Sequence, residues 1–299
     1  MPASTTSNVV LCLHGYLQNA NLFRVKSGAF KKILKKRKLI CHFENAPFIV
    51  WLDCEKRSHI CIDDEFDSPF PDWKQVWISK YKAIFPLLSS LTASDRELIA
   101  TSSEQPLRGW WTRNDVFHTG LCASVEYCFH LLQNIDFHMC VGFSQGTTVL
   151  LLLQRIFQES YPILSFSPYF PSLEYLKRDG CAREISRTDL LGLETDISHK
   201  IATYDPKSIV CEGKESCFPP SPFFLTPKSS ISPILSNCLV IVGSDDKVIN
   251  PDDCASYVKE IIGNEVIWHK MGHFIPTTKE MKEIYLSHID KIRSEYFHG

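Results

Sequence analysis

The sequence predicts an α/β fold in which helices flank a mostly parallel central sheet. Apolar strand-length runs alternate with helical patterns along the chain, which is typical of a parallel sheet. The strand runs are continuously apolar, as expected of strands that are covered on both faces. A length of 299 residues suits one large domain. We therefore expect residues 1–299 to form a single domain, with an insertion at 171–233.

Each element has its own signal. The first strand is the run Val9-Val10-Leu11-Cys12-Leu13, and the helix after it has Phe23, Phe30, Ile33 and Leu34 as its apolar set. Later strands are similar apolar runs, and each is followed by a helix-length pattern. The predicted strands are 9–13, 39–43, 138–143, 163–167, 238–243 and 265–268, and the predicted helices are about 22–36, 119–134, from 146 onward, 251–262 and 278–296.

Two regions interrupt this alternation. Residues 51–103 show no regular period, 63–71 resemble a loop, and Arg108-Gly109-Trp110-Trp111 suggests a tight aromatic turn. The segment 171–233 has prolines dense enough in its second half to exclude regular helix or central strand. Such a segment is either a lid over the site or a disordered loop. Its phenylalanines near 218–224 suggest that such a lid would be apolar.

Composition limits the partners. The net charge is −2, which gives no reason to expect nucleic acid or an anionic membrane surface as partner, and the lysines and arginines at 31–38 indicate the solvated face of a helix. No apolar run approaches the roughly 18 to 20 residues of a membrane helix. The N-terminus lacks a signal-peptide pattern, so we expect a cytoplasmic protein, and a nuclear location is compatible with this. The twelve cysteines include no C-x-x-C pair, so we expect no metal site, and nothing in the sequence indicates another cofactor.

The stretch Gly142-Phe143-Ser144-Gln145-Gly146 is the most informative motif. It fits the G-x-S-x-G nucleophile elbow, in which a serine occupies a strained turn between a strand and a helix. The flanking sequence fits as well, because a strand run precedes Gly142 and a helical run follows Gly146. Side chains at the two glycines would collide with the neighbouring helix and strand. Ser144 is therefore the candidate nucleophile.

A serine nucleophile needs a base, and the base needs an orienting carboxylate, in the chain order Ser, Asp or Glu, His. Asp246 follows a late strand within Gly243-Ser244-Asp245-Asp246 and is the preferred acid, with Asp245 as the alternative. His273 follows the last strand and is the preferred base, with His269 as the alternative. These positions lie at the carboxyl ends of parallel strands, where ligand sites collect.

The oxyanion hole needs two backbone N–H groups. Gln145 should supply one of them, because it directly follows the nucleophile. Tyr16 should supply the other from the loop His14-Gly15-Tyr16 after the first strand. A histidine this early in the chain is out of order for the base, so we interpret His14 as a structural residue of that turn.

Taken together, these stretches resemble the eukaryotic serine hydrolases known as the FSH family. The matching stretches span nearly the full length in the right order and are Leu11 to Asn19, Asn45-Ala46-Pro47, Arg108 to Trp111, Gly142 to Gly146, and Gly272 to Pro276. Phe137-His138 and Thr147 depart from an Asp-Gly pair and an alanine that are usual in the family, and the 171–233 segment is longer than expected.

The resemblance implies an α/β-hydrolase fold and a triad of Ser144, Asp246 and His273 acting on a small-molecule acyl ester or thioester. An acyl-protein thioesterase or lysophospholipase of similar fold is an alternative, because such enzymes also carry Gly-Phe-Ser-Gln-Gly. A non-catalytic binding protein on a hydrolase scaffold is a third reading. No oligomeric state is predicted.

Overall fold

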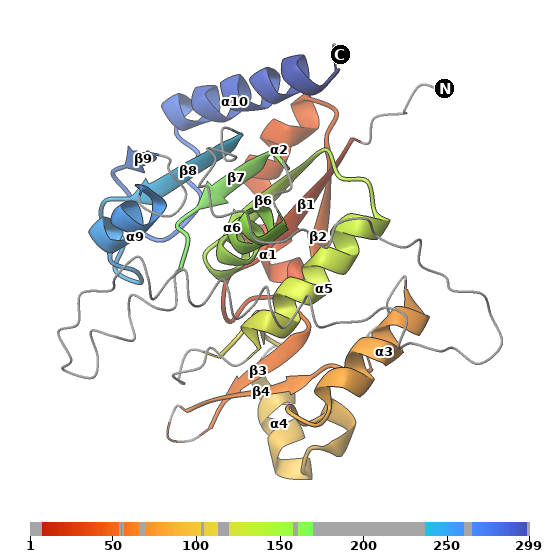
Figure 1. Cartoon of the computed structure of the whole chain (residues 1–299). Helices are drawn as coiled ribbons and strands as arrows, with labels where there is room; N and C mark the ends of the chain where they lie inside the picture. The colour runs from red at the N-terminus through yellow and green to blue at the C-terminus, as the bar shows by residue number, and fades with distance from the viewer. Residues whose placement is uncertain are drawn as a thin grey trace, which may run out of the picture.

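The computed structural model describes residues 8–53, 55, 57–65, 70–102, 105–112, 120–157, 161–169, 237–259 and 265–297. Its centre is a six-stranded sheet in the order β2-β1-β6-β7-β8-β9, and every neighbouring pair is parallel (Figure 1). The prediction of a mostly parallel sheet is therefore confirmed. The predicted lid or loop at 171–233 lies outside the described residues.

The strands of this sheet coincide closely with the predicted ones. They are β1 (Val9–Leu13), β2 (Ile40–Glu44), β6 (Met139–Phe143), β7 (Ile163–Phe166), β8 (Cys238–Gly243) and β9 (Val266–His269). The chain leaves β1 toward β2 on one side and later returns to β6 on the other side. A crevice at such a reversal is where ligands bind in open α/β sheets, and the loops after β1 and β6 meet there.

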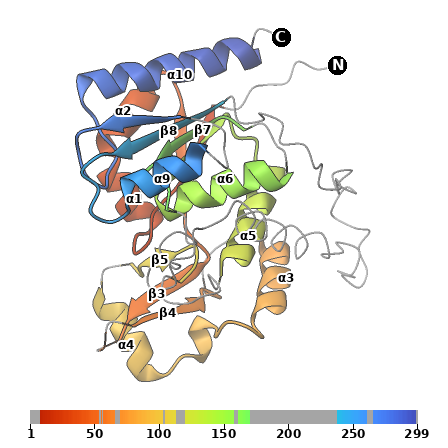
Figure 2. The ribbon, with the colours of Figure 1, turned by 60° about the vertical axis from the view of Figure 1, so that its left-hand side comes forward.

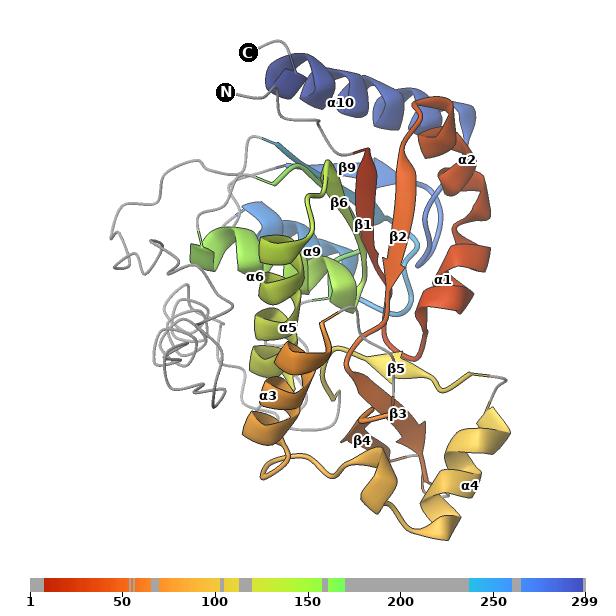
Figure 3. The same cartoon turned by 90° about the vertical axis from the view of Figure 1, so that its right-hand side faces the viewer.

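Helices cover both faces of the sheet. One face carries α1 (Ala20–Lys26), α2 (Gly28–Lys36) and α10 (Lys279–Phe297) (Figure 3). The other carries α5 (Leu121–Asn134), α6 (Gln145–Phe157) and α9 (Pro251–Tyr257). Each face has its own apolar core of buried side chains. In the described ranges, no helix combines the length and apolarity needed to cross a membrane.

The first predicted helix is two helices in the structure. Ser27 separates α1 from α2, and its hydroxyl donates to the carbonyl of Phe23 over 2.6 Å. A serine can offer its own side chain to the carbonyl of the preceding turn, and Gly28 follows it with little helix propensity. The interruption therefore has a local cause in the Ser-Gly pair.

Residues between β2 and α5 form a second, antiparallel sheet that the sequence pattern did not reveal. Its order is β4-β3-β5, and Figure 2 shows it below the parallel sheet. The elements of this unit are β3 (Phe48–Leu52), β4 (Ser58–Ile62), α3 (Pro71–Tyr81), a 3₁₀ turn (Leu88–Ser90), α4 (Ala93–Ser102) and β5 (Arg108–Gly109).

The prediction of a tight aromatic turn at Arg108 to Trp111 is therefore wrong in part. Arg108 and Gly109 pair with Ile49 and Phe48 as strand β5, and all four residues of the stretch are buried. A strand of two residues is too short to show an alternating pattern, so its sequence resembles a turn.

Two glycines allow the strand β6 and the helix α6 to meet at a sharp angle. A Cβ on Gly142 would lie 2.4 Å from the Cα of Thr147 in α6. A Cβ on Gly146 would lie 2.5 Å from the carbonyl oxygen of Leu13 at the end of β1. Both collisions involve backbone, which cannot rotate away as a flexible side chain can. The predicted role of both glycines is confirmed.

We expect Gly146→Ala to destabilise the fold by about 1–3 kcal/mol or more, because the added methyl group overpacks a backbone contact. Gly28→Ala is the matched control, since a Cβ there meets nothing within 4 Å. That substitution in α2 should be neutral or stabilise by up to about 1 kcal/mol. Urea unfolding of both variants checks the pair. Equal midpoints for the two would contradict this account of the elbow.

Candidate active site

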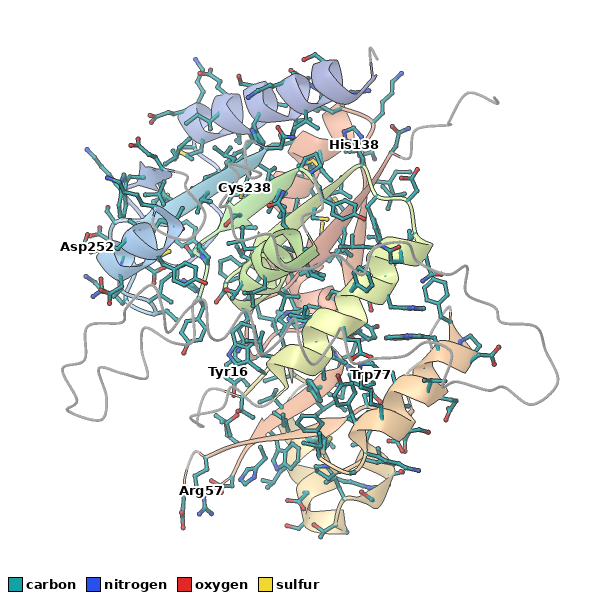
Figure 4. The ribbon with its side chains drawn as sticks, in the orientation of Figure 1. Tyr16, Arg57, Trp77, His138, Cys238 and Asp252 are labelled. Atoms are coloured by element: carbon teal, nitrogen blue, oxygen red, sulfur yellow. The ribbon has the colours of Figure 1, made fainter. Side chains whose placement is uncertain are left out.

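The predicted site residues lie at one edge of the parallel sheet. Ser144 follows β6, Asp246 follows β8 and His273 follows β9, each at the carboxyl end of its strand. Tyr16 follows β1, and Figure 4 shows it at the junction between the two sheets. His138 and Cys238, which lie at the other ends of β6 and β8, appear at the far end of the sheet in the same view.

Ser144 occupies a strained backbone conformation between β6 and α6. Its φ is 53°, in the left-handed region that residues with a side chain rarely adopt. Its N–H donates to the carbonyl of Phe166 over 2.9 Å, and its own carbonyl accepts from Thr147 over 3.1 Å. Strain of this kind persists where neighbouring structure holds the residue in place, and it is common at functional turns.

Asp246 is the buried member of the aspartate pair, whereas Asp245 is exposed. One carboxylate oxygen of Asp246 accepts the backbone N–H groups of Val248 and Ile249, over 2.8 and 3.1 Å. Burial alone would raise the pKa of Asp246, but the bond to His273 and these two N–H groups outweigh it and hold the pKa below its usual value. The side chain is therefore an ionised carboxylate near neutral pH.

His273 faces both this carboxylate and the elbow. Its Nδ1 lies 2.6 Å from Oδ2 of Asp246. An ionised carboxylate only accepts hydrogen bonds, so Nδ1 carries the proton and, in the neutral ring, Nε2 has a free lone pair. The ring centre lies 4.8 Å from that of Phe143, the residue before Ser144. Among the described residues, no hydrogen bond joins the Ser144 hydroxyl to His273.

His269, the alternative base, is placed differently. It is buried, and neither of its ring nitrogens has a hydrogen-bond partner. Its carbonyl accepts both the backbone N–H and the hydroxyl of Ser244. The structure therefore brings His273, and not His269, to a carboxylate.

The two residues predicted for the oxyanion hole, Gln145 and Tyr16, belong to segments that lie close to Ser144. Gln145 is the first residue of α6, so its N–H belongs to the group of helix N-terminal donors that lack a partner within the helix. The loop that carries Tyr16 is close to the nucleophile, because a Cβ on Gly15 would lie 3.2 Å from the Cβ of Ser144. The loop after β1 therefore lies beside the serine and against the first turn of α6.

A buried hydrogen-bond network, missed by the sequence analysis, holds these loops together. The side chain of Gln145 accepts the N–H of Trp110 over 3.0 Å and donates to the carbonyl of Trp111 over 3.1 Å. The indole N–H of Trp110 donates to the carbonyl of His14 over 2.8 Å. The elbow, the loop after β1 and the end of β5 are thus one hydrogen-bonded unit. The only sequence signal for this network was that the three stretches involved all match the same family.

His14 completes this network as a structural residue, in agreement with its interpretation from the sequence. Its Nε2 accepts the N–H of Ala46 over 3.0 Å, and its Nδ1 is 2.7 Å from the carbonyl of Gly15. The first contact requires a lone pair on Nε2, so Nδ1 carries the proton and donates. The ring is fully buried, and burial lowers the pKa of His14 to about 4.

Arg108 connects the network to the antiparallel sheet. Its guanidinium donates to the carbonyl of Ala46 over 3.0 Å and pairs with the carboxylate of Asp63. Both side chains are buried, where removing one partner would leave an uncompensated charge. The hydroxyl of Tyr16 also reaches this sheet by a hydrogen bond with Ser58. The position of the loop after β1 is thus fixed from two sides.

The parallel sheet, the strained serine after β6 and the loops after β8 and β9 define the α/β-hydrolase fold. A family model described as serine hydrolase (FSH1) matches residues 3–171 and 193–285. The chain belongs to this serine hydrolase family. Within the long segment 171–233, the family match resumes at residue 193, so only part of that segment lies outside it.

Two curated relatives are similar over almost the whole chain. Esterase OVCA2 of Danio rerio is 23% identical over 284 residues, which cover 92% of this chain and 93% of the relative. Esterase OVCA2 of Homo sapiens is 23% identical over 294 residues, which cover 94% and 95%. Among solved structures, Zea mays acyl-protein thioesterase 2 has a TM-score of 0.42 and 13% identity, covering 97% of this chain and 96% of that one.

We expect His14 to stay neutral in the folded protein down to about pH 5, because burial lowers the pKa of His14 to about 4. In the unfolded chain a histidine has a pKa near 6.5. The stability that depends on the neutral ring is therefore complete above about pH 6.5 and decreases as the pH falls toward 4. NMR titration of the His14 ring checks this, with the urea-unfolded chain as control. A folded-state midpoint near 6.5 would contradict it.

Proposed function

We propose that this protein hydrolyses carboxylic esters or thioesters with Ser144 as nucleophile, His273 as base and Asp246 as the orienting carboxylate. The observation that carries the proposal is the 2.6 Å contact between His273 Nδ1 and Asp246, beside a serine with a φ of 53°. The family membership and the names of the two esterase relatives support the same reaction class.

In the proposed reaction, the Ser144 hydroxyl attacks the acyl carbonyl while His273 Nε2 takes its proton. Asp246 holds the imidazole in the required tautomer and stabilises the imidazolium that forms. The N–H groups of Gln145 and Tyr16 stabilise the oxyanion of the tetrahedral intermediate. His273 then protonates the leaving alcohol or thiol, which leaves an acyl-enzyme on Ser144. Water, activated by the same base, releases the acid.

The strained turn suits this role. Ser144, whose φ is 53°, lies between the end of β6 and the first turn of α6. The dipole of α6 has its positive end there, which favours negative charge next to the nucleophile.

We propose that the ester is the main substrate, because the curated relatives are named esterases. Comparing kcat/KM for an ester and a thioester with the same acyl group tests this choice.

Replacing Ser144 by alanine should lower kcat by about 10³-fold or more without changing thermal stability, because the attacking oxygen is lost. A fluorophosphonate probe should label the wild-type protein on Ser144, as located by peptide mass spectrometry. Ser244→Ala is the control, since Ser244 lies exposed in the loop after β8 and its hydroxyl bonds a backbone carbonyl. Labelling that persists in Ser144→Ala would refute the assignment.

The two aspartates give a second test of the proposed roles. Asp246→Asn should lower kcat by about 10³- to 10⁴-fold, because an amide in place of the carboxylate favours the wrong tautomer of His273. Asp245→Asn changes the neighbouring exposed residue in the same way and should leave kcat nearly unchanged. Steady-state ester hydrolysis by both variants measures the difference. Equal losses in the two would argue against Asp246 as the acid.

A further inference from the structure

The positive charge of this chain is concentrated in one place. Residues 1–43 contain no aspartate or glutamate, and the first acidic residue is Glu44. Eight of the 32 lysines and arginines lie between Arg24 and Lys38. The net charge of −2 therefore hides a strongly basic segment in an otherwise acidic molecule.

The structure places this segment on the outer surface of α1 and α2. The apolar side of the two helices, including Phe23, Phe30 and Leu34, is buried against the parallel sheet. The exposed basic residues form what we call the basic face: Arg24, Lys26, Lys31, Lys32, Lys35, Lys36 and Lys38. Figure 3 shows both helices on the outside of the sheet, with α10 beside α2.

Little in the described part of the chain neutralises this face. Arg37, between its last two lysines, forms an ion pair with Asp290 of α10 over 2.7 Å. No other basic residue from Arg24 to Lys38 takes part in an ion pair among the described residues. Like charges this close together repel each other, so an anionic partner would lower the energy of the face.

Three features favour a bilayer over a nucleic acid as that partner. Six of the seven charged side chains are lysines, which attract diffuse negative charge, whereas arginine is the usual residue for bidentate phosphate recognition. The aromatic side chains between residues 20 and 40, Phe23 and Phe30, are buried and offer no stacking surface for bases. Val25 and Ile40 are 69% and 64% exposed, which suits contact with lipid.

We propose that the basic face docks this protein on an anionic lipid bilayer. Clusters of four to eight lysines and arginines on a helical surface are typical of binding to phosphatidylserine-rich membranes. The face also begins at the active-site edge, because α1 starts directly after the loop that carries Tyr16. The lysines from Lys31 to Lys38 extend toward the opposite end of the sheet, where Ile40 pairs with Val9 at the start of β1. Docking would therefore lay this side of the sheet along the membrane.

Vesicle sedimentation of the full chain tests the proposal. The wild-type protein should bind vesicles of equimolar phosphatidylcholine and phosphatidylserine, and should not bind phosphatidylcholine alone. Binding should weaken as salt is added, because exposed charges are screened beyond about 8 Å at physiological ionic strength. Replacing Lys31, Lys32, Lys35 and Lys36 by glutamine should weaken binding more than a hundredfold, at roughly fivefold for each charge.

A matched control distinguishes the effect of the basic face from the effect of net charge. Lys247, Lys259, Lys270 and Lys279 are exposed lysines outside the face. Replacing these four by glutamine changes the net charge by the same amount but should preserve most of the vesicle binding. Circular dichroism checks that both variants are folded. Ser144→Ala should bind vesicles like the wild type, so the outcome does not depend on the proposed hydrolysis.

Two results would overturn the proposal. One is equal binding of the wild-type protein to vesicles with and without phosphatidylserine, and the other is an equal loss in both glutamine variants. The proposal would also be overturned if the wild-type protein did not bind the vesicles but retarded single-stranded RNA in a gel. That result would assign the basic face to nucleic acid instead.

Discussion

The close approach of the α6 N-terminus to the end of β1 is the constraint on which the rest of this structure depends. Only hydrogen fits between Gly146 and the carbonyl of Leu13. This contact sets the helix against the loop that carries Tyr16, so two distant parts of the chain come close to Ser144. It also forces Ser144 into the left-handed region, since the chain has one residue in which to turn from strand to helix. Position and strain at the serine have the same origin.

Two histidines at this edge of the sheet, the buried His14 and the partly exposed His273, differ in their hydrogen-bond partners, and the partners determine which role each can have. His14 bonds a backbone N–H and a backbone carbonyl, and burial without a charged partner keeps its ring neutral and fixed. His273 faces the ionised Asp246, which would stabilise a positive imidazolium next to the elbow. A general base must accept and release a proton, so only the second environment suits one. Chain order in the sequence led to the same distinction without any knowledge of these contacts.

The sequence was sufficient for the parallel sheet and for the positions of Ser144, Asp246 and His273, because apolar runs mark buried strands and loops follow them. The contact of His273 with Asp246 agrees with the preference for both over their neighbours, although their catalytic roles stay predictions. The antiparallel sheet was not foreseen, since β5 has only two residues and α4 carries no clear apolar stripe. The bonds from Gln145 to Trp110 and Trp111 were also missed. Partners 35 and 34 residues apart leave no periodic signal, and a glutamine after a nucleophile suggests only its backbone amide.

Trp110 also has a consequence for the order in which this protein folds. Its indole bonds a residue 96 positions earlier, and its backbone N–H bonds one 35 positions later. Contacts between such distant positions form late, because a long loop must close before they stabilise anything. Asp246 and His273 lie 102 and 129 residues after Ser144 in the sequence. A ribosome-bound chain that has emerged only as far as Ser144 would therefore carry the serine without the rest of its site. The hydroxyl gains its proposed partners only after residue 273 has also emerged.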